Sequence, residues 1–370
     1  MTRTATPTTP PPEWVDADAT PWTDMQLRDL TLPNRVWLSP MCQYSADEHG
    51  APTGWHLAHY GARAAGGVGM VMVEATAVAP DMRTTVGDLG LWSKRQVDAH
   101  RRLAELIRSV GSVPAVQLGL AGRKSSHGIP WDNTGTRHPV SPADGGWQPL
   151  APSPLPFSGL TTPRSMSAAD IDRVLGDVER AARNAHRAGY EALGLQGSNG
   201  YLFHQFLSPL ANERTDAWGG DLEGRLRFPL AVVSALRAGW PAEKPLVIRT
   251  PVTDLLEAGV TTDDTEVLVA RMAELGVDLV DINSGVLVPE APRPSEPLEN
   301  TRFAQRLRKL GMLTATSGSV TEAHQLHEAI PNSVDALLVG RAMLRDPYWA
   351  LRARGGPPTD VWPKQYHRAF

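Results

Sequence analysis

Amide, arginine and glycine residues close a series of short apolar runs, and their types make them the first candidates for chemistry. Side-chain amides donate neutral hydrogen bonds, arginine carries a fixed positive charge, and glycine lets backbone N–H groups approach a ligand closely. If the ends of the runs meet at one face of the fold, these residues form a single polar site. In chain order they are Ser39-Pro40-Met41-Cys42, Glu74-Ala75-Thr76, Gln117, Gln196 with Asn199, Arg249, Asn283-Ser284-Gly285, Ser317-Gly318 and Gly340-Arg341.

The last two of these groups favour a phosphate site. Ser317-Gly318-Ser319 is predicted to open a helix near Thr321, and Gly340-Arg341 follows the last apolar run. Glycine N–H groups can bond phosphate oxygens, and the guanidinium of Arg341 can pair with them through two hydrogen bonds. Barrel enzymes often bind phosphate between their seventh and eighth units, which is where both groups fall. The alternative is that the glycines only turn the chain.

Three other patterns are weaker candidates for a site. The loop 66–69 contains three glycines, but it precedes its apolar run, whereas a dinucleotide fingerprint follows a strand and opens a helix. His56 and His59 lie three apart on a predicted helix, and without a third ligand at metal spacing they favour helix packing. The single cysteine, Cys42, excludes an internal disulfide and a cysteine-ligated cluster. No metal site is predicted.

Eight short apolar runs, rich in β-branched residues, alternate with longer segments of helical period. Such runs suit parallel strands that are buried on both faces. Eight strand–helix units predict an α/β protein, a closed (β/α)8 TIM barrel with its site at the carboxyl ends of the strands. The predicted strands are Val36–Leu38, Met70–Glu74, Ala115–Leu118, Ala192–Leu195, Leu246–Arg249, Leu279–Ile282, Leu313–Ala315 and Ala336–Val339.

Two helices and one insertion have clear boundaries. The first helix starts after Ser167 and stops at Gly189. The second starts with Thr262, ahead of acidic residues that suit a helix amino terminus, and stops at Gly276. A Gly-, Pro- and Ser-rich stretch, 119–163, follows the third strand and is too long for a simple connection. We expect this long insertion to cover the functional face of the barrel.

Length, charge and composition limit the class of protein. The chain has 370 residues, of which 41% are hydrophobic and 21% charged, and these fractions exclude disorder as its overall state. A net charge of −4 offers no basic excess for nucleic acid. Residues 1–24, rich in Thr and Pro, predict a flexible arm, and 25–370 a single barrel domain. Because no apolar run approaches the ~20 residues needed to cross a bilayer, we expect no membrane span, and the lone cysteine fits the cytoplasm.

A further set of motifs runs in order through positions 30–370. They are Ser39-Pro40-Met41-Cys42-Gln43-Tyr44-Ser45, His56-Leu57-Ala58-His59-Tyr60, Gln117, Ala121-Gly122-Arg123-Lys124, Gly200-Tyr201-Leu202, Phe206-Leu207-Ser208-Pro209-Leu210, Asn212-Glu213-Arg214-Thr215-Asp216, Gly219-Gly220, Arg225, Gly340-Arg341 and Arg345-Asp346-Pro347. Together they resemble the old yellow enzyme family of FMN-dependent ene-reductases, in particular its bacterial subclass with a cysteine near the flavin.

The resemblance implies an FMN across the top of the barrel, with its phosphate near Gly318 and Gly340-Arg341. Arg249 would lie beside the N1/O2 edge, where positive charge stabilises the reduced flavin, and Gln117 on the pyrimidine side. Cys42 would tune the flavin. The alternatives are that Arg249 is a buried arginine paired with a carboxylate and Cys42 a small buried hydrophobe. The implied cofactor-binding residues are Ser39, Pro40, Met41, Cys42, Ala75, Gln117, Arg249, Ser284, Gly318, Gly340 and Arg341.

In the family that this chain resembles, NADPH or NADH reduces the flavin and leaves. Flavin N5 then passes a hydride to the β-carbon of an activated alkene, and a tyrosine supplies the proton to the α-carbon. Tyr201 matches that tyrosine, and Tyr44 matches one that lines the substrate pocket. The alternative is that both tyrosines are packing aromatics.

The chain departs from the family where the substrate carbonyl is held. A His and a His or Asn usually stand three apart there, and this chain has Gln196 and Asn199, with Leu120 replacing another histidine. Two amides can still donate to one oxygen, but they do not titrate near neutral pH. Besides reduction of activated C=C bonds, two alternatives stay open: flavin-dependent dehydrogenation or double-bond isomerisation, and a flavin-binding protein without turnover.

The carboxyl terminus adds one expectation. Tyr366-His367-Arg368-Ala369-Phe370 resembles the tail with which the subclass reaches into a neighbouring subunit's site. Arg368 would then bind substrate in the partner's site, and the protein would be a homodimer or a larger homo-oligomer. The alternative is that Arg368 is only a solvated terminal charge.

Overall fold

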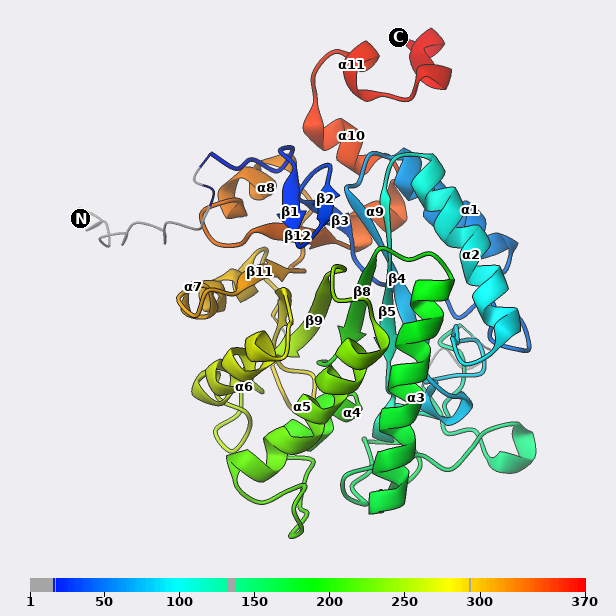
Figure 1. Cartoon of the computed structure of the whole chain (residues 1–370), viewed down its shortest axis with the longest axis vertical. Coiled ribbons are helices and arrows are strands. Elements are labelled where there is room, and N and C mark those ends of the chain that lie inside the picture. Colours follow the sequence, from blue (N-terminus) through cyan, green and yellow to red (C-terminus); the bar gives the residue numbers. More distant parts are fainter. Residues whose placement is uncertain (1–15, 17, 132–136, 293) are drawn as a thin grey trace, which may run out of the picture.

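Eight parallel strands close into a barrel at the centre of the molecule (Figure 1). The computed structural model describes residues 16, 18–131, 137–292 and 294–370. The order around the barrel is β3-β4-β5-β8-β9-β10-β11-β12, and β12 pairs with β3 to close the ring. The TIM barrel predicted from the apolar runs is confirmed. The strands are β3 (Val36–Leu38), β4 (Met70–Ala77), β5 (Val113–Gly119), β8 (Ala192–Gln196), β9 (Leu246–Pro251), β10 (Leu279–Asn283), β11 (Leu313–Thr316) and β12 (Ala336–Val339).

Both faces of the strands are buried, which explains why each strand is an unbroken apolar run. In β4, Met70 and Met72 belong to the hydrophobic cluster inside the barrel, and Val71 and Val73 to the cluster beneath the helices. All four are at most 2% exposed. Because side chains alternate along a strand, this two-sided burial fixes which residues reach the barrel interior.

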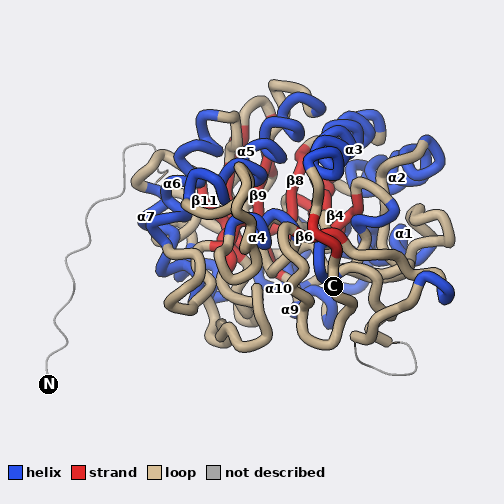
Figure 2. Tube along the Cα trace, turned by 90° about the horizontal axis from the view of Figure 1, so that it is seen from below, coloured by secondary structure: helices blue, strands red, loops and turns tan. Residues whose placement is uncertain are grey.

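Helices surround the strands, as Figure 2 shows in blue and red. Ser167 begins α3 as predicted, since its hydroxyl accepts a hydrogen bond from the Asp170 N–H at 3.2 Å. The second helix begins at Thr262 as predicted, and the preceding residue, Thr261, is its N-cap, because its hydroxyl accepts a hydrogen bond from the Asp264 N–H at 3.1 Å. The helices are α1 (Gly54–Ala65), α2 (Lys94–Ser109), α3 (Ala168–Arg187), α4 (Leu202–Leu207), α5 (Leu222–Gly239), α6 (Thr262–Glu274), α7 (Ala304–Arg308), α8 (Ala323–Ala329), α9 (Arg341–Arg345), α10 (Trp349–Arg354) and α11 (Pro358–Val361).

The predicted insertion after the third barrel strand lies between β5 and α3. It consists mostly of loops, with short 3-10 turns at Gly122–Lys124 and Pro142–Asp144. The segment between β5 and α3 also contains a two-stranded sheet that the sequence did not predict: β6 (Leu150–Ala151) lies within the predicted insertion, and β7 (Arg164–Ser165) follows directly after its predicted end. Residues 132–136 of the insertion lie outside the described part of the chain.

A hairpin that the sequence analysis missed closes the amino-terminal end of the barrel. It is formed by β1 (Met25–Leu27) and β2 (Leu30–Leu32). Met25, Leu27 and Leu32 join the cluster inside the barrel and are at most 3% exposed. The opposite end, where the strands finish, therefore remains as the face for a site.

Most of the predicted arm, residues 1–15 and 17, lies outside the described residues. Its described end packs against the barrel: the carboxylate of Asp16 lies 3.1 Å from the Arg35 guanidinium, and Ala19 is 4% exposed. Among the described residues, no helix combines the length and apolarity that a membrane crossing requires.

Candidate active site

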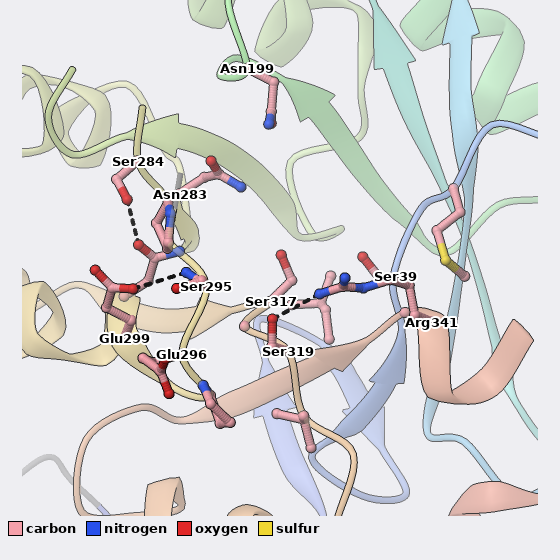
Figure 3. Close-up of a pocket in the computed structure, with 18 of the residues that line it drawn as sticks. Ser39, Asn199, Asn283, Ser284, Ser295, Glu296, Glu299, Ser317, Ser319 and Arg341 are labelled. Atoms are coloured by element: carbon pink, nitrogen blue, oxygen red, sulfur yellow. Dashed lines mark hydrogen bonds between the residues drawn. The ribbon is translucent and has the colours of Figure 1, made fainter. Parts of the chain in front are cut away.

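A cavity of about 680 Å³ lies at the carboxyl ends of the strands (Figure 3). Its walls come from the segments that follow β3, β8, β10, β11 and β12, together with Arg249 of β9. The volume falls within the range of small-molecule and cofactor sites. Of the residues predicted to bind the cofactor, those that line this cavity are Ser39, Pro40, Met41, Arg249, Ser284, Gly318, Gly340 and Arg341.

Arg249 is both paired with a carboxylate and exposed to the cavity. Its Nε donates to Asp281 Oδ2 at 2.6 Å, and both side chains are at most 7% exposed. Its Nη2 lies 3.4 Å from the hydroxyl oxygens of Ser39 and Ser317. Burial raises the pKa of the Asp281 carboxyl, and the charge of Arg249 opposes this shift. The pairing fixes the guanidinium so that one edge remains available to a ligand.

The part of the cavity lined by Gly318, Ser319 and Arg341 has the features of an anion site. Arg341 Nη2 donates to the Ser319 hydroxyl at 2.8 Å. A Cβ on Gly340 would lie 3.3 Å from the sulfur of Met41, and one on Gly318 would lie 3.4 Å from the amide nitrogen of Leu298. Side chains at these two glycines would therefore occupy space beside the cavity.

One prediction for this region was wrong. Ser317-Gly318-Ser319 does not open a helix, because α8 begins at Ala323 with Glu322 at its N-cap. The three residues instead form a loop along the cavity wall. Gly340 does lead directly into α9, whose first residue is Arg341.

A second, small cavity lies over the ends of β4, β5 and β8. Gln196 and Tyr201 line it together with Ala75 and Leu120. Leu120 is 1% exposed, so it contributes an apolar wall. Burial raises the pKa of the Tyr201 phenol, which therefore keeps its proton at neutral pH.

Asp88 also lines the small cavity, and the sequence analysis did not single it out. Its carboxylate accepts hydrogen bonds from the Thr84 N–H and hydroxyl at 2.6 and 2.7 Å and from the Thr85 hydroxyl at 2.9 Å. Burial nevertheless raises the pKa of Asp88 to about 6. All three donors are on Thr84 and Thr85, four and three positions before Asp88. Two hydroxyl residues at this short distance before an acidic residue are the sequence signal that could have identified Asp88.

Asn199 belongs to the larger cavity, where its side chain points inward in Figure 3. It has a positive φ of 56°, and Gly200 follows with 70°. Asparagine and glycine are the residues that adopt this left-handed conformation most easily. The predicted pair thus shares one tight turn, with Gln196 directed to the small cavity and Asn199 to the large one.

Cys42, Tyr44 and Gln117 are not among the described residues that line either cavity. Burial raises the pKa of the Cys42 thiol, and the nearby Asp88 carboxylate adds to the effect. Burial also raises the pKa of Tyr44, whose ring packs edge-on against Trp131 at 5.3 Å. Gln117 is 3% exposed within β5.

Arg368 lies in the terminal 3-10 segment Lys364–Ala369, outside the residues that line both cavities. Figure 1 shows this segment, in red, extending beyond the barrel. An aromatic group holds it together: Tyr348 packs against Trp362 and Tyr366, with ring centroids 5.9 and 5.7 Å apart.

The two histidines of α1 pack within the fold. His56 is fully buried, and its Nδ1 accepts from the Thr53 N–H at 3.0 Å. Burial lowers the pKa of His59 to about 3, so it is neutral at physiological pH. Within the described part of the chain, no group of three potential ligands is placed to hold a metal ion.

The barrel and its cavity define a cofactor-binding α/β-barrel enzyme. The arginine, hydroxyl and glycine groups of Arg341, Ser319 and Gly318 suit a phosphate, and the fixed charge of Arg249 suits an anionic ring. This donor set and the cavity volume fit FMN.

Comparisons with known proteins give the family. The model of the NADH:flavin oxidoreductase / NADH oxidase family matches residues 22–360. The NADPH dehydrogenase of Geobacillus sp. (strain WCH70) is 38% identical over 349 residues, which cover 93% of this chain and 96% of that protein. The NADPH dehydrogenase of Bacillus subtilis (strain 168) is 35% identical over 354 residues, with 94% and 98% covered. Morphinone reductase in complex with tetrahydroNAD superposes with a TM-score of 0.75 at 26% identity, covering 94% of this chain and 98% of that one. The chain therefore belongs to the NADH:flavin oxidoreductase / NADH oxidase family, the old yellow enzyme family, and is an FMN-dependent NAD(P)H oxidoreductase.

Proposed function

We propose that the protein uses NADPH or NADH to reduce the C=C bond of α,β-unsaturated carbonyl compounds. The observation that carries this proposal is that the protonated Tyr201 phenol, the Gln196 amide and the apolar Leu120 line one hollow, the small cavity. Its free space of about 10 Å³ would admit only the reacting end of a substrate, and the rest would extend outside it. Such a reduction needs two groups: a hydrogen-bond donor to the substrate's carbonyl oxygen, and an acid that protonates its α-carbon.

The larger cavity supports the proposed position of FMN. Gly318, Gly340 and Arg341 would hold the phosphate, with Ser284 on the cavity wall. The flavin ring would lie against the remaining members of the predicted set, which are Ser39, Pro40, Met41, Cys42, Ala75, Gln117 and Arg249. When bound, FMN accepts a hydride from the nicotinamide and donates one to the substrate. Arg249 would favour the reduced form, because its fixed positive charge would stabilise the negative charge that the ring gains.

Three side chains would act on the substrate directly. Gln196, from the small cavity, and Asn199, from the large one, would donate N–H groups to a carbonyl oxygen placed between them, which would stabilise the negative charge that develops there. Tyr201 gives its proton to the α-carbon. Tyr44 would line the approach to the site. Both groups that donate hydrogen bonds to the carbonyl oxygen are neutral amides. We therefore expect them to stabilise the developing negative charge less than a cationic donor would.

Two finer assignments belong to the same proposal. Cys42 would be a flavin-proximal cysteine, and its high pKa means that it would act as a neutral thiol. Arg368 would contribute to the site of a second subunit, since its own segment extends away from the barrel. The protein would therefore be a homodimer or a larger homo-oligomer, and we place it in the cytoplasm.

The experiment that tests the reaction is an anaerobic titration of the FMN-loaded protein, followed by its visible spectrum. NADPH should bleach the flavin, and cyclohex-2-enone should restore its colour. If NADPH bleaches the flavin but a panel of enones leaves it reduced, ene reduction is excluded. Desaturation of a saturated ring ketone in the presence of oxygen would then favour dehydrogenation.

A further inference from the structure

The turn that carries Gln196 and Asn199 has a backbone fixed by buried side chains. The Lys124 ammonium, 2% exposed, donates to the Asn199 carbonyl at 2.7 Å. On the next residue, Gly200, the N–H donates to His204 Nδ1 at 3.0 Å and the carbonyl accepts from Gln205 at 2.8 Å. His204 is in turn held by Asp254, 2.7 Å from its Nε2. These contacts hold the backbone of the turn, but they do not determine which way the side-chain amides of Gln196 and Asn199 face.

That direction decides the chemistry of the site. The oxygen and the nitrogen of a side-chain amide are nearly equal in size, so a half-turn of the group replaces a donor with an acceptor. A carbonyl substrate needs the nitrogens to face it. Some group must therefore hold the amide oxygens away from the substrate.

Ser198, which lies between the two amides and is fully buried, is that group. Its backbone N–H donates to Gln196 Oε1 at 3.3 Å. Its hydroxyl lies 2.7 Å from Asn199 Oδ1 and 3.1 Å from Gln196 Oε1. A hydroxyl has one proton to donate, and the shorter contact assigns it to Asn199. Gln196 is then held by the backbone and Asn199 by the serine side chain.

We propose that Ser198 is a positioning residue that turns the Asn199 amide so that its nitrogen faces the cavity. Figure 3 shows this nitrogen directed toward the cavity. The consequence is that Asn199 presents a hydrogen-bond donor, not an acceptor, to a ligand in this cavity. This inference rests on the proposed function, since it assigns the carbonyl-binding amides.

A double-mutant cycle tests it by binding rather than turnover. The probe is cyclohexanone, a ketone without a C=C bond, and its dissociation constant is measured from the change in flavin absorption of the oxidised FMN-loaded protein. Ser198→Ala should raise this constant about five-fold, the effect of one neutral hydrogen bond. In an Asn199→Gly background the same change should alter it less than about two-fold, because the group that Ser198 orients is gone. Glycine is chosen because it tolerates the positive φ at position 199.

Ser112→Ala is the matched control. Its hydroxyl is also buried, but it donates to the Val68 carbonyl at 2.6 Å, just before β5 at the other end of the barrel. This variant should leave cyclohexanone binding unchanged.

The outcomes separate the inference from the proposed function. No binding of cyclohexanone by the unaltered protein would count against carbonyl recognition itself. If Ser198→Ala weakens binding equally in the unaltered protein and in the Asn199→Gly background, the positioning role is overturned. A general structural effect of the alanine would not depend on Asn199. If the alanine variant does not retain FMN, Ser198→Cys replaces it: the thiol is a weaker donor of similar size. The cysteine variant should then weaken binding only where Asn199 is present, and equal weakening again overturns the inference.

Discussion

The guanidinium of Arg249 and the carboxylate of Asp281 form a buried pair on adjacent strands, with Nε 2.6 Å from Oδ2. Asp281 engages one edge of the guanidinium, and the other edge faces the hydroxyls of Ser39 and Ser317. Arg249 lines the large cavity, and Asp281, which does not line it, holds the charged guanidinium in place. We therefore expect both stability and FMN binding to depend on this arginine.

Arg249→Met should lose both properties. It leaves Asp281 buried without a cation, which costs about 3–5 kcal/mol of the free energy of unfolding. It also removes the proposed flavin contact, so the dissociation constant of FMN should rise. Chemical denaturation and fluorescence titration with FMN measure the two effects.

Arg308→Met is the control for that variant. Arg308 makes a comparable buried pair with Asp335, at 2.8 Å and with both side chains 5% exposed, but it does not line the cavity. We expect a similar loss of stability with FMN affinity retained. Equal loss of FMN from both variants would contradict a direct role of Arg249.

Tyr201→Phe should slow the oxidative half-reaction. Removing a general acid typically costs about 10²-fold in rate or more. Stopped-flow mixing of the dithionite-reduced protein with cyclohex-2-enone measures this step. Because the pKa of Tyr201 is raised by burial, the rate in the unaltered protein should not fall between pH 6 and 9 through loss of this proton. Tyr190→Phe, which removes a buried hydroxyl bonded to His100, should react normally, and a normal rate in Tyr201→Phe would exclude the role.

The barrel could be predicted because local and global signals agree in it. Runs such as the start of β4 are apolar on both faces, and Ser167 both caps a helix and precedes an amphipathic pattern. The hairpin formed by β1 and β2 could not be found in the same way. β1 and β2 each place one exposed polar residue, Gln26 or Thr31, between two apolar ones, so neither is an unbroken apolar run like the equally short β3.

Part of the lining of the large cavity could be predicted for a similar reason. The residues at strand ends follow from barrel geometry, so Ser39, Arg249 and Gly340 could be assigned to one face. Ser198 and Asp88 could not, because their roles depend on how side chains turn within a folded loop.

Gln196→His should make ligand binding depend on pH. An amide does not titrate, whereas a histidine becomes a charged donor below a pKa near 6.5. Cyclohexanone should therefore bind the variant about five-fold more tightly, relative to the unaltered protein, at pH 5.5 than at pH 8. Asp88 lines the same cavity and has a pKa of about 6, but it is present in both proteins, so their ratio isolates the histidine. A ratio that is constant with pH would mean that position 196 does not contact the ketone.

Asp88→Asn should remove a pH dependence of stability. The pKa of Asp88 is raised by burial from 3.8 to about 6 in the folded protein, so the folded state binds more protons than the unfolded state between these values. The stability contributed by its neutral form is lost as the pH rises through this window. Between pH 5 and 7 the unaltered protein should lose about 1 kcal/mol relative to the variant. Asparagine keeps the hydrogen bonds from Thr84, and urea denaturation at both pH values gives the comparison. Parallel changes in the two proteins would contradict the buried titration.

Arg368→Ala tests whether one subunit completes the site of another. Alone, this variant should lose turnover of cyclohex-2-enone, whereas Lys364→Ala on the same segment should not. Mixing Arg368→Ala with Tyr201→Phe subunits is more decisive, because each inactive chain then supplies what the other lacks. In a random mixture of dimers, roughly a quarter of the sites would combine Tyr201 with an Arg368 from the partner. Recovery of activity on mixing supports the trans assignment. A mixture that stays inactive although mass measurement shows mixed dimers would place Arg368 outside the neighbouring site.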